Sequence, residues 1–431
     1  MDGVTLPRET TVLVIGGGPV GLVASGLLSQ RGVAHVVVER RRETTRAPAA
    51  HVLRRPSMAI FERLGVGDEI RHHAPPLALD FVTWCATLGG AEIGRLDLRP
   101  VDPATGRRRA EPWTNCSQNV LEPILWRHAD RADRATLVAA AECIGLAQRA
   151  DSVAVRIRRD DDREEEVVAR YVIAADGAGS KARRLLGVTM DGQGPLGRFF
   201  MVHFEADLGP WIHDRSGPLF WILNPESPGC LIVHDATKSH VMMMPVRGID
   251  REEDGLQGRL AAALGVPVPA EIISVDAWSP HAQVASQYRV GRVFLAGDAA
   301  HRFPPTGGLG LNTGIAEVHD LVDRLVGVLS GGAPEERLDG YEAECRPVAL
   351  ANACESFDNM KRLGEIAQAI GPCADLPGLE KRLASMRAGE RIALQQAIDR
   401  QASHFLSDGR TPGSLSGVAG RAGAQLAGRQ A

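Results

Sequence analysis

Apolar residues gather in short uninterrupted runs in the early, middle and late parts of the chain. Such runs, rich in β-branched residues and closed by glycine or a carboxylate, are typical of strands buried in a parallel sheet. An apolar period of about 3.6 residues follows the first and the last of them and predicts helices there. We therefore predict an α/β fold. The runs are residues 11–15 (TVLVI), 33–39 (VAHVVVE), 171–176 (YVIAAD) and 292–296 (RVFLA).

A different pattern fills residues 199–246, where apolar and polar positions alternate over several short stretches. Alternation of this kind predicts antiparallel strands, and residues 81–86 and 91–96 are expected to join the same sheet. A sheet rich in aromatic residues and methionine suits a flat apolar ligand, and we expect a substrate cavity against it. Most of these side chains must simply form the core of the sheet. The candidates for substrate contact are Trp221, His234 and Met242.

The composition narrows the class of protein. The chain has 431 residues, 44% hydrophobic, with a formal net charge of −4, and no basic stripe that would favour nucleic acid. Seven scattered cysteines without a C-x-x-C pair argue against a disulfide framework and against a metal site. The N-terminus lacks the pattern of a signal peptide or a membrane helix. We expect a cytoplasmic protein, monomeric or homodimeric, that uses neither membrane nor nucleic acid as a partner.

The first strand runs into a glycine-rich turn. Gly16, Gly18 and Gly21 fit G-x-G-x-x-G, a helical pattern follows, and the next strand ends at Glu39. In a dinucleotide fold these glycines permit a tight turn, close approach of a pyrophosphate, and close packing of the helix. A carboxylate at the position of Glu39 would bind ribose hydroxyls and disfavours a 2′-phosphate. This turn leaves both FAD and NAD open.

A second glycine-rich stretch, residues 297–314 (GDAAHRFPPTGGLGLNTG), lies far downstream. It places Asp298 at the tip of a strand and bare backbone at the start of a helix, as a planar ring and a polyol chain would require. Between the two stretches, Asp176 and Gly177 end another strand, and Ser180 is a candidate cap of the helix after it. A molecule long enough to use both glycine stretches favours FAD over NAD.

In this order, the three motifs resemble the single-component FAD-dependent aromatic hydroxylases, the p-hydroxybenzoate hydroxylase-like family. Four further segments resemble its phenol, chlorophenol and polyketide ring hydroxylase branch: residues 49–53 (AAHVL), 58–66 (MAIFERLGV), 204–208 (FEADL) and 397–405 (AIDRQASHF).

The resemblance implies a Rossmann-like FAD-binding domain of the GR2 type, an inserted antiparallel-sheet substrate domain and a C-terminal helical segment. We expect the FAD domain at 1–80, 115–190 and 286–345, the substrate domain at 81–114 and 191–285, helices at 346–410 and a flexible tail at 411–431. Many phenol hydroxylases carry a further thioredoxin-like domain, which we do not expect here.

The resemblance also assigns residues to FAD. Its implied contacts run from the pyrophosphate through the ribose and adenine to the ribityl chain and flavin ring, with Pro305 near the reacting edge. They are Gly16, Gly18, Pro19, Val20, Gly21, Glu39, Arg40, Arg55, Gln118, Asp176, Gly177, Gly297, Asp298, Pro305, Gly308, Gly310, Leu311 and Asn312.

The sequence departs from the family pattern near the flavin. Pro56 stands where the family often has an arginine, and Arg54 or Arg55 would have to substitute for it. Glu317 replaces an aspartate of the following helix, and Leu309 replaces a glutamine. We expect FAD binding to survive these changes, and we expect them to bear on how the flavin moves between positions.

The implied reaction is aromatic hydroxylation. NADH or NADPH, bound transiently, reduces FAD, O₂ adds to the reduced flavin, and the flavin hydroperoxide hydroxylates a phenol- or polyketide-type ring. Candidates for a catalytic base or a positioning group are His51, His213, His234 and His301, of which we favour His51 and His234 together with Pro305. Baeyer–Villiger oxygenation of a ketone and a non-catalytic flavin-binding scaffold remain alternatives. A flavin halogenase lacks its signature here, and a plain NAD dehydrogenase leaves residues 297–314 unexplained.

Overall fold

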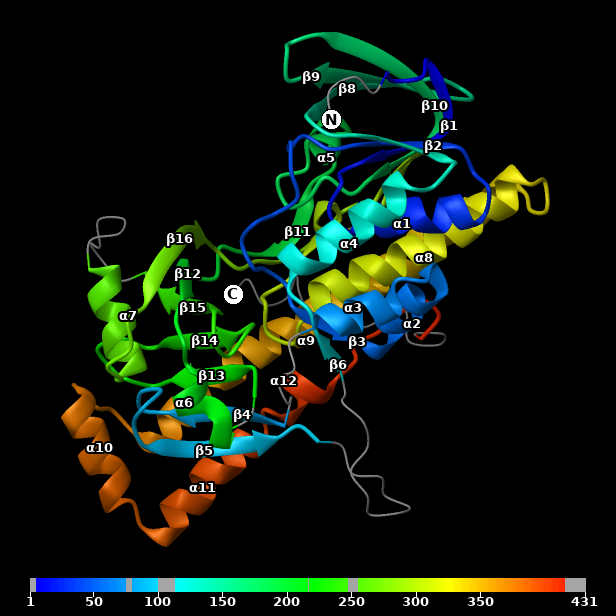
Figure 1. Cartoon of the computed structure of the whole chain (residues 1–431). Coiled ribbons are helices and arrows are strands. Elements are labelled where there is room, and N and C mark those ends of the chain that lie inside the picture. Colours follow the sequence, from blue (N-terminus) through cyan, green and yellow to red (C-terminus); the bar gives the residue numbers. More distant parts are fainter. Residues whose placement is uncertain (1–4, 75–79, 100–112, 216, 247–254, 415–431) are drawn as a thin grey trace.

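The computed structural model describes residues 5–74, 80–99, 113–215, 217–246 and 255–414. It contains two large sheets, with the C-terminal helices beside the second (Figure 1). Parts of the expected domain segments at both termini and in 81–114 and 191–285 lie outside the described residues, including most of the predicted tail. The domain boundaries therefore stay predictions.

The first sheet has the parallel core that the uninterrupted apolar runs predict. Val12, Leu13 and Val14 are fully buried, because helices and loops cover both faces of their strand. A hairpin with its turn at residues 160–163 extends the sheet on one side. In sheet order the strands are β18 (Arg289–Val290), β19 (Val293–Leu295), β10 (Glu164–Ala174), β1 (Glu9–Ile15), β2 (His35–Val38) and β7 (Ala135–Val138), with β9 (Val153–Arg159) beside β10 and β8 (Ala141–Gln148) beside β9.

Helices α1, α4 and α8 lie together against this sheet (Figure 1). Pro19 occupies the first turn of α1, where a missing N–H costs nothing. Gly308 begins α8 in the left-handed conformation, with a φ of 61°. The helices of this region are α1 (Pro19–Gln30), α2 (Arg55–Leu64), α3 (Gly67–His73), α4 (Gln118–Asp130), α5 (Lys181–Leu185) and α8 (Leu309–Leu329), with 3-10 turns η2 (Gly297–Ala299) and η3 (Glu335–Leu338).

The second sheet contains the alternating strands, and β4 and β5 join it as predicted. One pair, β4 with β13, is parallel, so the sheet is mixed rather than purely antiparallel. This follows from topology, because β4 enters the sheet from a distant part of the chain. The order is β16 (Glu271–Trp278), β12 (Phe199–Glu205), β15 (Ser239–Pro245), β14 (Gly229–Val233), β13 (Leu219–Ile222), β4 (Phe81–Cys85) and β5 (Glu92–Asp97).

The two faces of this sheet have different neighbours. Phe220 and Leu231 pack with the buried face of α7 (Leu256–Leu264), whereas Trp84 packs on the other face with the C-terminal helices. Short elements complete the fold: β3 (Val52–Arg54) paired with β6 (Trp113–Asn115), the sheet of β11 (Met190–Gln193), β17 (Ala282–Ala285) and β20 (His301–Arg302), α6 (Gly209–Ile212) and η1 (His213–Arg215).

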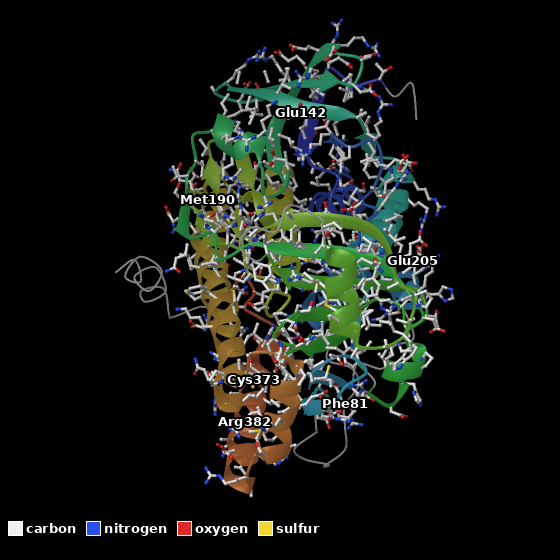
Figure 2. The ribbon with its side chains drawn as sticks, turned by 90° about the vertical axis from the view of Figure 1, so that its left-hand side faces the viewer. Phe81, Glu142, Met190, Glu205, Cys373 and Arg382 are labelled. Atoms are coloured by element: carbon white, nitrogen blue, oxygen red, sulfur yellow. The ribbon has the colours of Figure 1, made fainter. Side chains whose placement is uncertain are left out.

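A long helix, α9, connects the regions (Figure 2). Near its start the Tyr341 hydroxyl donates a hydrogen bond of 2.7 Å to the carbonyl oxygen of Leu295 at the end of β19. Near its end Ile366 and Ile370 join the core around Trp84. This helix therefore fixes the two sheets relative to one another. The C-terminal helices are α9 (Asp339–Ile370), α10 (Leu376–Ser385), α11 (Ala388–Asp399) and α12 (Ala402–Leu406).

Candidate functional site: a flavin cavity and an aromatic sheet face

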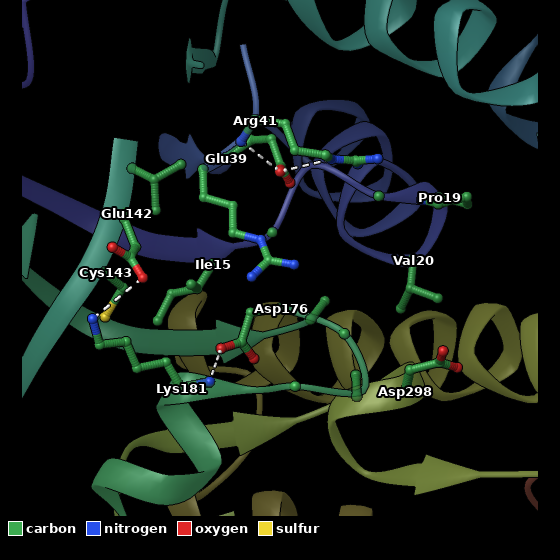
Figure 3. A pocket seen from close by; sticks show the side chains of 18 of the residues that line it. Ile15, Pro19, Val20, Glu39, Arg41, Glu142, Cys143, Asp176, Lys181 and Asp298 are labelled. Atoms are coloured by element: carbon green, nitrogen blue, oxygen red, sulfur yellow. Dashed lines mark hydrogen bonds and ion pairs between the residues drawn. The ribbon is translucent and has the colours of Figure 1, made fainter. Parts of the chain in front are cut away.

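A cavity of about 310 Å³ opens at the carboxyl ends of β1, β2 and β10. Parallel strands bring the residues that follow them to one edge of the sheet, where α/β proteins bind ligands. Figure 3 shows Glu39 on one side of this cavity and Asp176 and Asp298 on the other. The expected FAD residues that line it are Gly16, Gly18, Pro19, Val20, Glu39, Arg40, Gln118, Asp176, Gly177, Asp298 and Leu311.

The glycines of the first turn have different surroundings. A Cβ on Gly16 would lie 2.3 Å from the carbonyl oxygen of Ala175, and one on Gly21 would lie 1.9 Å from that of Gly16. A Cβ on Gly18 would meet no atom within 4 Å. Gly16 and Gly21 are thus required by packing, whereas Gly18 keeps space free at the N-terminus of α1, where a phosphate would be stabilised.

The Glu39 carboxylate is held in place by its own neighbourhood. It accepts hydrogen bonds from the backbone N–H of Gly17 (2.6 Å) and from the backbone N–H and Nε of Arg41 (both 2.9 Å). These donors fix the carboxylate at the end of β2, beside the glycine turn. This is where the ribose of a bound ADP group is expected.

The sequence reading missed several polar residues of the cavity. Glu122, fully buried, accepts hydrogen bonds from Gln118 Nε2 (2.6 Å) and from the backbone N–H of Thr45 (2.8 Å). On the far side, Lys181 Nζ lies 3.2 Å from Glu142 Oε1. For Glu122, the sequence offered one signal: it lies four residues after Gln118, a spacing at which two side chains of a helix can meet. The other missed lining residues with polar side chains are Arg41, Cys143 and Arg184.

Asp176 lines the cavity, but its carboxylate is already used by the protein. It accepts hydrogen bonds from the Ser180 hydroxyl and from the backbone N–H groups of Lys181 (2.8 Å) and Ala182 (3.0 Å), at the start of α5. Ser180 caps this helix through the N–H of Arg183, as predicted. The middle motif is therefore at least a structural corner, and its contact with a cofactor stays a prediction.

Asp298 is differently placed. Asp298 is accessible from the cavity. The protein around the cavity nevertheless partly desolvates its carboxyl group, which raises the pKa of that group. The charges that act on this carboxyl group at a distance are those of His301, Arg302 and Glu317. No hydrogen bond to its side chain is found among the described residues. The segment is a short 3-10 turn, and Glu317 Oε2 accepts the N–H of Gly297 at 2.9 Å. Asp298 is thus a positioned acceptor with free capacity.

At the start of α8, some of the expected FAD residues are used within the protein, whereas others are free to contact a ligand. The Asn312 amide accepts from the Arg54 N–H and the Ser57 hydroxyl and donates to the carbonyls of Val52 and Gly308, so its side chain holds the loop. Pro305 is exposed. Gly21, Gly297, Gly308 and Gly310 are likewise outside the lining of the cavity.

Two arginines were possible substitutes for the missing family arginine. Arg54 is buried and donates to the carbonyl oxygens of Gly307 (2.6 Å) and Phe405 (2.7 Å). Arg55 is exposed, pairs with Asp408 and does not line the cavity. Arg54 thus contacts residues 305–312 at the start of α8, which we call the flavin loop because the expected flavin contacts lie there. The assignment of Arg55 to FAD stays a prediction.

The candidate substrate residues lie on both faces of the second sheet. Trp221 belongs to the face that packs against Trp113 and the C-terminal helices. Met242 pairs with Leu231 and is fully buried in the core beneath α7, so it does not share a space with Trp221. This corrects the expected grouping, since only the register could tell which methionine faces which side. Met243 lies on the face of Trp221.

We call the residues Met201, Trp221, Ile232 and Met243 the Trp221 face; all are partly exposed. His234 follows β14 and lies 5.4 Å from His51 between ring centroids. Burial lowers the pKa of His51 to about 4 and that of His234 well below 6.5. Both imidazoles are therefore neutral at physiological pH, which makes each a weak base.

The residues that line the cavity fit FAD. The open space at Gly18 suits a pyrophosphate, Glu39 suits a ribose, and the available Asp298 carboxylate suits a polyol chain. Leu311 extends the cavity toward the loop that begins α8. Within the described residues no cluster of His, Cys, Asp or Glu could hold a metal ion, and no helix there is both long and apolar enough to cross a membrane.

Comparison with known proteins agrees with this fit. Residues 9–356 match the family model "FAD binding domain". The chain is 34% identical over 388 residues to 2,4-dichlorophenol 6-monooxygenase of Cupriavidus pinatubonensis, covering 85% of this chain and 64% of that protein. It is 36% identical over 386 residues to tetracenomycin B2 monooxygenase-dioxygenase of Streptomyces olivaceus, covering 83% and 69%.

Among solved structures, the flavin-dependent monooxygenase PieE in complex with FAD and substrate superposes with a TM-score of 0.86 and 29% identity, covering 93% of this chain and 73% of that one. The chain thus spans about two thirds of the length of these relatives. It belongs to the FAD-binding domain family that includes these flavin monooxygenases.

Proposed function

We propose that this protein is a monooxygenase that hydroxylates an aromatic, phenol- or polyketide-type molecule with O₂ and NADH or NADPH. One observation carries the proposal: the flavin loop lies between the FAD cavity and the Trp221 face. Leu311 of the loop lines the cavity, and Gly308 packs against Val52, where a Cβ on the glycine would lie 2.9 Å from that of Val52. Val52 and Trp221 both pack against the core group that contains Trp113.

The chain's own residues position the reactants. Bound FAD supplies the redox and oxygen chemistry. Glu39 and Asp298 hold its ribose and ribityl hydroxyls, and α1 presents backbone N–H groups to its phosphates. The Trp221 face offers an apolar surface on which a flat ring can lie, and the C-terminal helices that pack on the same side of the sheet help to exclude water. Names of the relatives, a dichlorophenol monooxygenase and a tetracenomycin monooxygenase-dioxygenase, support an aromatic substrate.

The test uses purified wild-type protein and Asp298→Ala. We expect yellow wild-type protein with bound FAD, slow oxidation of NAD(P)H alone, faster oxidation with a suitable phenol or naphthol, and a product heavier by one oxygen atom in mass spectrometry. Asp298→Ala should lose most of its FAD, since a hydrogen bond to a charged group contributes about 1.5–3 kcal/mol. An oxygen inserted beside a carbonyl would instead indicate the Baeyer–Villiger reaction. If wild type binds FAD and Asp298→Ala loses it, but no substrate speeds NAD(P)H oxidation by wild type, the protein is a flavin-binding scaffold.

A further inference from the structure

Four buried polar side chains meet where the β3–β6 ribbon touches the second sheet. We call His51, Trp113, Asn115 and His234 the His51 cluster; none is more than 9% exposed. The His51 ring lies 6.2 Å from that of Trp113 and 5.4 Å from that of His234, both edge-on. His51 Nδ1 lies 2.8 Å from Asn115 Oδ1. The four side chains come from three segments that are far apart in the sequence.

This cluster contains unpartnered polar atoms. Trp113 Nε1, Asn115 Nδ2 and both ring nitrogens of His234 have no hydrogen-bond partner among the described residues. Buried polar atoms are almost always paired, and each unpaired one costs free energy. A group of them around one imidazole is what a polar ligand would satisfy.

The chemistry of these atoms defines the ligand. An indole N–H and an amide NH₂ can only donate, and a neutral imidazole adds one further donor. Burial keeps the pKa of both histidines low, so the cluster itself is uncharged. The charged or titratable groups that act on it are Arg54 near His51 and the imidazoles of His203 and His240 near His234. None is a carboxylate, so the complement is an oxygen that accepts hydrogen bonds.

The location relates this oxygen to the flavin. Ala50 lines the FAD cavity, His51 follows it, and Val52 contacts the flavin loop at Gly308. Trp113 packs in the same apolar group as Trp221. A ring oxygen held by the cluster would leave the ring itself against the Trp221 face, beside the loop.

We propose that the His51 cluster is the subsite that holds a ring oxygen of the aromatic substrate, as a phenolate or a carbonyl oxygen. This proposal rests on the proposed function, because it assumes an aromatic substrate at the Trp221 face. Hydrogen bonds to phenolate stabilise the ionised form, so the cluster would lower the pKa of a bound phenol without requiring a strong base.

The probe is 2-naphthol, which carries a single oxygen, titrated by naphtholate absorbance on FAD-loaded protein without NAD(P)H. Wild-type protein should bind it with a pKa below that of free 2-naphthol. Trp113→Phe and Asn115→Leu should each weaken the binding of the naphtholate. Each should raise the pKa of bound 2-naphthol by about one unit, a tenfold change, as expected for the loss of one hydrogen bond to a charged oxygen. Affinity for naphthalene, which lacks the oxygen, should stay the same in Trp113→Phe.

Tyr171→Phe is the matched control, because it removes another buried, unpartnered donor from the core of the first sheet. It should leave the naphthol titration unchanged, and FAD content reports that each variant is folded. An unshifted pKa in wild type, no binding of the probe, or a pKa of the bound probe in both cluster variants equal to that in wild type would overturn the subsite. Hydroxylation by wild type with an unshifted probe would refute the subsite alone, whereas a shifted probe without hydroxylation of any substrate would refute the proposed function alone.

Discussion

Two carboxylates of the FAD cavity, Glu39 and Asp176, are paired by the protein, whereas the buried His51 cluster keeps polar atoms without a partner in the described residues. Glu39 receives three hydrogen bonds from residues within or beside its own turn, and Asp176 receives bonds from the start of α5. Trp113, Asn115 and His234 have atoms without partners in the described structure.

The difference reflects how each region is built. Local backbone turns organise the FAD end, so its geometry exists before a ligand arrives and costs little to use. The His51 cluster forms only where the β3–β6 ribbon meets the second sheet, and it keeps unpaired polar atoms that a ligand could bind. If the proposed subsite is correct, short sequence motifs preorganise the cofactor end, whereas substrate selectivity depends on long-range contacts.

The largest expected effect concerns the backbone of the first turn. Gly16→Ala should destabilise the protein by about 4 kcal/mol, because the residue has a φ of 109° and its new Cβ would lie 2.3 Å from a carbonyl oxygen. Urea unfolding measures the loss of stability, and FAD content should fall with it.

Gly18→Ala sharpens the same comparison. Its Cβ would meet no protein atom within 4 Å, so the FAD-free protein should keep its stability while its affinity for FAD falls. Equal loss of stability in both variants would mean that the space beside Gly18 serves packing rather than a phosphate.

The sequence predicted the first region well for a physical reason. Local patterns reveal residues of strand–turn–helix units, because such residues are close in sequence. Those that line the cavity include Gly16, Gly18, Glu39 and Asp298. Seven strands in the second sheet were mostly foreseeable from alternation. The parallel pairing of β4 with β13 was not, because it depends on which distant strand fills the edge.

The same limit applies to adjacent residues whose surroundings depend on distant parts of the chain. Met242 and Met243 are adjacent in a methionine run, and only the strand register decides which one faces Trp221. Arg54 and Arg55 are adjacent too, and only the position of the C-terminal segment shows which one is buried. Trp113 and Asn115 carried no motif, since their importance arises from contact with His51 and His234.

An intermediate effect is expected at the buried pair behind the flavin loop. Glu317 Oε2 accepts hydrogen bonds from the N–H of Gly297 and from His301 Nε2, the latter at 3.2 Å. Burial lowers the pKa of His301, but the charge and hydrogen bond of Glu317 more than offset this and raise it above 6.5. Glu317→Gln should cost about 2 kcal/mol of stability at neutral pH.

The sign of the pH dependence follows from the raised pKa. A histidine with a higher pKa in the folded state stabilises fully below its unfolded value and loses this contribution as pH rises through the folded value. The unfolding free energy of wild type should therefore fall as the pH rises above about 6.5 and through the raised pKa of His301. In Glu317→Gln this part of the slope should vanish; an unchanged slope would locate the titration elsewhere.

A smaller effect is expected where the two regions are joined. Arg54 links β3 to the flavin loop and to the C-terminal segment through carbonyl oxygens, and burial lowers its pKa to about 10. Arg54→Lys keeps the charge but cannot make both bonds in the same planar geometry. We expect a loss of about 1.5 kcal/mol in FAD binding, measured by flavin fluorescence.

The smallest effect, from Arg55→Ala, makes the adjacent arginine a matched control. Its guanidinium lies 2.9 Å from Asp408, but its side chain is 64% exposed, so solvent screens the pair. We expect less than about 0.5 kcal/mol change in stability or FAD affinity. If Arg55→Ala instead lowers FAD affinity more than Arg54→Lys does, the arginine that serves the flavin is the exposed one, and it must turn away from Asp408 when FAD binds. The contrast between a preformed cofactor end and an incomplete substrate end would then fail at the point where the two meet.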